Sequence, residues 1–197
     1  MIQAFAGLAL AVASVAAQSA TIDLQPIVAC VSAGPLKAVE AQKRTSTDTT
    51  RAVSVAGGLE RQVSVLEGYR VMLASASGQY FVNLKIERSA ADKAEADREA
   101  IRQQMQAFVA KAPAGSPPMK RENSGGVETV GMDQSSLEVS GTMGLYTLFV
   151  PKADLVITAY LLNQPPAKRD FATYADYERL RDQALEQVKA CLPKAAS

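Results

Sequence analysis

Two cysteines, Cys30 and Cys191, are the residues whose type and spacing most clearly allow chemistry in this 197-residue chain. They lie near the two ends of the region that follows a secretion-like leader, and we expect them to form a disulfide. Because disulfides persist in oxidising compartments, the pair predicts export. We interpret the bond as structural, with a labile regulatory disulfide as the alternative.

The sequence contains no histidine. Its absence removes the commonest general base, the commonest zinc ligand and every Ser-His or Cys-His nucleophile. Paired carboxylates could still catalyse glycoside hydrolysis, but 20 acidic residues give no way to select two. Asp92, Glu95 and Glu99 share one helix face, which we interpret as solvent-facing. We therefore expect a non-catalytic protein without a cofactor or a metal ion.

Four tyrosines on predicted strands are the candidate ligand-binding residues: Tyr69, Tyr80, Tyr146 and Tyr160. Tyrosine combines a large apolar ring with a polar tip, so these side chains could line a cleft. Core packing, with the hydroxyl at the rim of the core, is the competing interpretation.

The N-terminal segment resembles a secretion signal in its composition. Ala4 to Ala17 is uncharged and rich in Ala, Leu and Val, and it is shorter than the roughly 20 residues that span a bilayer. We expect a signal peptide over residues 1–17, cleaved after Ala17 or one residue earlier. A lipid-modified Cys30 is disfavoured because polar Asp23 interrupts the apolar segment before it. The mature chain should be periplasmic or secreted, with no stable membrane span.

The overall charge gives no reason to expect a nucleic-acid partner. The chain carries 21 basic and 20 acidic residues, a formal net charge of +1, and its hydrophobic fraction of 48% is that of a globular protein. The partner that we expect is instead a protein or another component of a bacterial-type cell envelope.

Two segments have the apolar periodicity of amphipathic helices. The first is expected from Ala90 to Ala112, capped by Ser89, with Ile101, Met105 and Phe108 on its apolar face. The second is expected from Thr173 to Leu192, where Thr173 and Asp176 have capping-box spacing. Cys191 continues the apolar stripe of the second helix and should face the core.

Each predicted helix follows a predicted β-hairpin. Residues 69–73 should pair with 80–86, and residues 146–150 with 155–161; further strands are expected at 63–66, 127–130 and 137–139. Shifting the first helix onto the second aligns several identical residues, which suggests a duplication. The predicted units are about 50–112 and 127–192, joined by a linker over 113–126.

Together these patterns predict one α+β domain over residues 18–197. We expect an antiparallel sheet with helices packed on one face, built from a duplicated hairpin-plus-helix unit and closed by the disulfide. The expected function is that of an exported, non-catalytic protein- or envelope-interaction module. The alternatives are a carboxylate-dependent hydrolase of an envelope polysaccharide, and a small-ligand binding module with a cleft between the two units.

Overall fold

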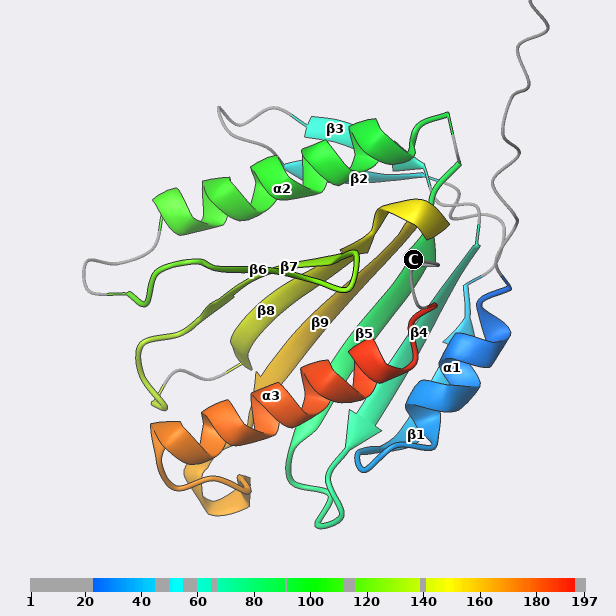
Figure 1. Cartoon of the computed structure of the whole chain (residues 1–197). Helices are drawn as coiled ribbons and strands as arrows, with labels where there is room; N and C mark the ends of the chain where they lie inside the picture. The colour runs from blue at the N-terminus through cyan, green and yellow to red at the C-terminus, as the bar shows by residue number, and fades with distance from the viewer. Residues whose placement is uncertain are drawn as a thin grey trace, which may run out of the picture.

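A seven-stranded antiparallel sheet is the centre of the protein (Figure 1). The computed structural model describes residues 23–44, 50–54, 60–64, 67–90, 92–111, 116–138 and 141–193. The expected signal peptide therefore lies outside the described residues. The strands of the sheet, in spatial order, are β1 (Lys37–Lys43), β4 (Glu67–Ala74), β5 (Phe81–Arg88), β9 (Leu155–Asn163), β8 (Gly141–Val150), β7 (Val127–Asp133) and β6 (Lys120–Ser124).

The remaining elements are a two-stranded sheet and three α-helices. The small sheet pairs β2 (Thr50–Ser54) with β3 (Glu60–Ser64). The helices are α1 (Gln25–Ser32), α2 (Ala94–Ala110) and α3 (Tyr174–Ala190), with short 3-10 turns η2 (Pro151–Ala153) and η3 (Pro166–Lys168). Within the described part of the chain, no helix is long and apolar enough to cross a membrane.

Both predicted hairpins are confirmed, and they lie side by side. Val71 of β4 pairs with Leu84 of β5, and Leu148 of β8 pairs with Ile157 of β9. The two hairpins join where Leu84 pairs with Ala159, so β5 and β9 form the middle of the sheet. The α+β class with an antiparallel sheet is therefore as predicted.

The expectation that the helices share one face of the sheet is wrong. Ile157 packs in the core that also contains α1 and α3, whereas its neighbour Val156 packs with Met105 of α2. Successive residues of a strand point to opposite faces, so α2 covers the face opposite α1 and α3 (Figure 1). Strand β9 begins with a continuous apolar run that is buried on both faces. The periodicity of a helix identifies its apolar stripe but not the sheet face that the stripe will cover.

The position of α2 and α3 on opposite faces of the sheet can be compared with the predicted duplication. If the two units were related by symmetry, a twofold axis perpendicular to the sheet would exchange the antiparallel neighbours β5 and β9. Rotation about that axis maps each face of the sheet onto itself. Such an axis would put α2 and α3 on the same face, but they lie on opposite faces. The two hairpins can be related by that axis and the two helices cannot, so common ancestry of the units stays a prediction.

The predicted capping box of α3 is confirmed, and the predicted cap of α2 is wrong. Thr173 and Asp176 exchange side-chain and backbone hydrogen bonds at the start of α3. Helix α2 begins later than predicted, at Ala94, and its N-cap residue Lys93 makes no side-chain cap. Ser89 is buried after β5, and its backbone N–H donates to the carbonyl of Asp154, which ties it to the end of the sheet instead.

Two smaller predictions also differ from the structure. The expected linker over 113–126 contains strand β6, which forms a hairpin with β7 through Gly125 and Gly126, both at positive φ. Of the strand expected at 137–139, Leu137 and Glu138 lie in a turn, and residue 139 lies outside the described residues. The strand expected at 63–66 overlaps β3, which ends at Ser64, and residues 65–66 lie outside the described residues.

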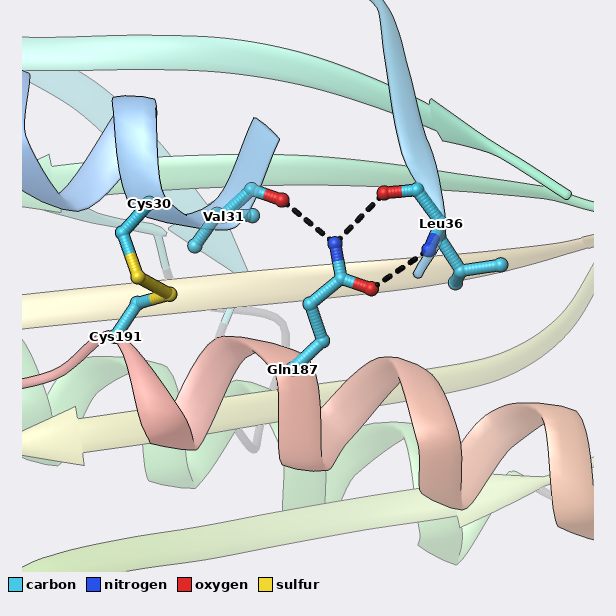
Figure 2. The surroundings of a disulfide bond; sticks show 5 residues. All are labelled: Cys30, Val31, Leu36, Gln187 and Cys191. Carbon is cyan, nitrogen blue, oxygen red and sulfur yellow. Dashed lines mark hydrogen bonds between the residues drawn. A yellow bond between two sulfur atoms is a disulfide. The ribbon is translucent and has the colours of Figure 1, made fainter. Parts of the chain in front are cut away.

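The predicted disulfide between Cys30 and Cys191 is present and joins α1 to the end of α3 (Figure 2). The two Cα atoms are 5.7 Å apart. Beside it, the amide of Gln187 donates to the carbonyls of Val31 and Leu36 and accepts from the Leu36 N–H, at 2.6, 2.7 and 2.9 Å. A covalent bond and three hydrogen bonds therefore hold the α1 segment on α3.

Candidate functional site

The four candidate tyrosines are not gathered in one cleft. Tyr69, Tyr80 and Tyr146 are buried in the core beneath α1 and α3. Tyr160 lies on the opposite face, is half-buried and lines two pockets. The core-packing interpretation therefore fits three of them, and Tyr160 is the one placed where a ligand could touch it.

A buried carboxylate anchors α3 on the sheet. The Asp133 side chain, at the end of β7, is 0% exposed. Its oxygens accept hydrogen bonds from the hydroxyls of Tyr146 and Tyr177 and from the guanidinium of Arg181, each at 2.7 Å. Lys120 of β6 adds an ion pair at 3.2 Å. We call these five residues the Asp133 cluster.

Two glycines make room for the Asp133 cluster. A Cβ atom on Gly131 would collide with the Tyr146 ring, and one on Gly144 would collide with the Tyr177 hydroxyl. Burial, followed by the nearby charge of Asp133, raises the pKa of both tyrosine hydroxyls. The hydroxyls therefore stay protonated and act as donors to the carboxylate.

The Asp133 cluster does not have the form of a catalytic pair of carboxylates. The acids that share its donors, Glu178 and Asp182, are both exposed: Glu178 accepts from Arg181 at 3.1 Å and from Lys120 at 3.3 Å, and Asp182 accepts from Arg181 at 2.8 Å. Both oxygens of Asp133 are already occupied by hydrogen bonds from buried donors. The cluster is explained by its structural role.

A groove with mainly apolar walls lies on the other face of the sheet, between α2 and strands β7, β8 and β9. It consists of two adjoining pockets of about 220 and 90 Å³, and Phe108, Leu145 and Tyr160 line both of them. The larger pocket also touches Met132, Asp133, Gln134, Thr142, Met143 and Gly144, and the smaller touches Ile101, Gln104, Met105, Thr147 and Thr158. We call the two pockets together the α2 groove.

Phe108 gives the α2 groove an exposed apolar wall. Its side chain is 50% exposed, and with Val39 it is one of two large exposed hydrophobic residues among those described. The residue lies on the predicted apolar stripe of α2, but it borders the two pockets and is not covered by the sheet. Phe108 and Tyr160 therefore face a space into which another apolar group can fit.

Ion pairs hold α2 over the sheet and fix the wall of the groove. Arg102 of α2 donates to one oxygen of Glu128 at 2.8 and 3.2 Å, and Arg121 donates to the other oxygen at 2.8 and 3.0 Å. The Arg102 guanidinium also stacks on Phe149, 5.0 Å from the ring centroid. Burial opposes ionisation of Glu128, but the two guanidinium groups outweigh it and lower the pKa of this carboxyl.

The two edges of the large sheet carry charged side chains. Edge strand β6 is exposed along its length and contains Lys120, Arg121 and Glu122. Edge strand β1 contains Glu40 and is interrupted by a bulge after Ala38. Charges and bulges on edge strands discourage the addition of another strand, so the α2 groove is the better candidate surface for binding.

Comparison with family models, with curated proteins and with solved structures found no match to this chain. The site must therefore be interpreted from its own geometry. The sequence indicated Tyr160 and placed Phe108 on an apolar stripe, but it gave no sign that the two line one groove, because that depends on the sheet face that α2 covers.

Proposed function

We propose that the chain is an exported, non-catalytic binding module that holds the apolar part of a small amphipathic ligand in the α2 groove. One observation carries the proposal: a half-exposed phenylalanine and a half-buried tyrosine form the walls of a concave, mainly apolar site between α2 and the sheet. Ligand sites typically combine such walls with a few polar groups.

The groove lies between the two predicted units, since α2 belongs to the first and β7, β8 and β9 to the second. This supports the small-ligand alternative over a broad protein-interaction surface. The larger pocket, at about 220 Å³, is smaller than the roughly 300–1,000 Å³ of drug-sized ligand sites. A single short acyl chain or a small aromatic molecule fits the two adjoining pockets better than a two-chain lipid does.

The disulfide supports an exported location, because such bonds persist in the periplasm and outside the cell. The carboxylate-dependent hydrolase gains no support from the site. Among the described residues, Asp133 is the only acidic one that borders the α2 groove, and its carboxylate is enclosed by donors from α3 and β8.

A neutral apolar fluorophore, N-phenyl-1-naphthylamine, tests the proposal directly. We expect saturable fluorescence enhancement with the wild-type protein and binding weakened roughly 4- to 12-fold in Phe108→Ser, since half of the roughly 1.5–3 kcal/mol of a buried Phe is lost. Val39→Ser is the matched control, because it removes the other large exposed hydrophobic residue among those described, on edge strand β1. No saturable enhancement, or equal loss in both variants, would contradict the proposal.

A further inference from the structure

We infer that the ligand of the α2 groove is an amphipathic carboxylate, whose charged end is held by Lys85 and Arg70 while its apolar chain enters the groove. This inference rests on the proposed function and adds the chemical class of the ligand to it. It follows from the position of two basic residues on the same sheet face, beside the groove.

Lys85 places a positive charge at the edge of the groove. Its ammonium nitrogen lies 5.1 Å from the centroid of the Tyr160 ring and 3.5 Å from the Tyr160 hydroxyl. Because Tyr160 lines both pockets, an anion bound to Lys85 would sit at the mouth of the groove. The half-buried stem of Lys85 also limits how far the ammonium can move from this position.

Arg70 adds a second positive charge next to the first. Arg70 of β4 pairs directly with Lys85 of β5, and like charges in directly opposed positions destabilise a sheet. Among the described residues, neither side chain forms an ion pair with a carboxylate. Two acidic residues lie on neighbouring positions of the sheet. Glu87 forms an ion pair with Arg44, and Glu40 of β1 is paired with Met72 instead of Arg70.

The sheet connects this basic pair to the apolar groove. The neighbouring row of paired residues crosses four strands from β4 to β8 and carries Met72, Asn83, Tyr160 and Leu145. All four side chains are partly exposed. An elongated ligand can therefore lie along this row, with its chain toward Leu145 and Phe108 and its charge toward Lys85 and Arg70.

A carboxylate suits the basic pair because a guanidinium and an ammonium can each donate to one of its oxygens. Arg70 and Lys85 are directly paired across β4 and β5 on one sheet face, and no carboxylate among the described residues forms an ion pair with either of them. Binding of an anion removes their repulsion, so the charged end should add to the affinity supplied by the apolar chain.

Calorimetric titration with decanoate and with its uncharged analogue decanol tests the inference. We expect the wild-type protein to bind decanoate about 10-fold more tightly than decanol, and we expect this preference to weaken with added salt, which screens exposed charges. Lys85→Gln and Arg70→Gln should each reduce decanoate affinity several-fold and leave decanol affinity unchanged. Lys168→Gln is the matched control, because it removes an exposed positive charge from η3, and it should change neither affinity.

The outcomes separate this inference from the proposed function. Equal affinity for decanoate and decanol, with loss of both in Phe108→Ser, would overturn the inference and leave the groove as a site for neutral apolar ligands. Equal effects of Lys85→Gln and Lys168→Gln would also overturn it. Binding of neither ligand would overturn the inference and the proposed function together.

Discussion

Substitution of Asp133 by asparagine should destabilise the protein far more than the same change at its neighbour Glu178. The Asp133 carboxylate accepts three hydrogen bonds of 2.7 Å from buried donors. An amide of the same shape keeps much of this geometry but loses the negative charge. Hydrogen bonds to charged groups contribute roughly 1.5–3 kcal/mol each, and neutral ones roughly 0.5–1.5 kcal/mol.

The expected loss from Asp133→Asn is therefore about 1 kcal/mol for each of three bonds, or about 3 kcal/mol in the free energy of unfolding. Arg181 keeps its contacts with Glu178 and Asp182, which places this value at the low end of the roughly 3–5 kcal/mol for breaking a buried ion pair. For a protein of this size, the melting temperature should fall by roughly 6–12 °C.

Urea unfolding followed by circular dichroism at neutral pH measures this difference. Glu178→Gln is the matched control: it makes the same acid-to-amide change in the same network, on a side chain that is 40% exposed. We expect Glu178→Gln to lower the free energy of unfolding by less than about 1 kcal/mol. If Asp133→Asn were no more destabilising than Glu178→Gln, the Asp133 cluster would not be the anchor of α3.

Three further changes test other parts of the fold. Gly131→Ala should destabilise the protein by about 1–3 kcal/mol, because the added methyl collides with the Tyr146 ring that Asp133 holds in place; an unchanged melting temperature would contradict this. Gln187→Ala should lower the free energy of unfolding by about 2–4 kcal/mol, since it leaves buried backbone groups of the α1 segment without partners. Amide hydrogen exchange should speed up most in that segment. The ion pairs of Glu128 lower its pKa, so the stability that they contribute is complete above the ordinary carboxyl pKa of 4.5 and is lost as the pH falls toward the lower folded-state pKa. Glu128→Gln should therefore flatten the dependence of the free energy of unfolding on pH in that acid range. An unchanged slope would refute the role of these ion pairs.

The sequence predicted the parts of the fold that depend on local patterns. Alternating apolar residues on either side of a turn identified both hairpins, and the spacing of Thr173 and Asp176 identified the start of α3. The apolar stripe of the second helix predicted that Cys191 faces the core, and Cys191 is partly buried against it. Each of these patterns lies within a short continuous segment of the sequence.

The features that sequence could not supply depend on contacts between distant segments. Asp133 is one acidic residue among many, and only the folded chain brings Tyr177 and Arg181 of α3 to it. The pairing of Arg70 with Lys85 depends on the register of β4 and β5, and its closeness to the groove depends on the β5–β9 pairing. The groove itself depends on the sheet face that α2 covers, which no local pattern determines.

The position of the disulfide also determines how the protein responds to a mechanical load. All strands of both sheets, together with the α2 groove, lie between Cys30 and Cys191 in the chain. A force that pulls on the two ends of the chain therefore passes through the sulfur–sulfur bond and bypasses the sheet. Only reduction would allow the 161-residue loop to extend, by roughly 550 Å at about 3.4 Å per residue. A molecule tethered at one end and pulled at the other would keep the α2 groove intact under tension.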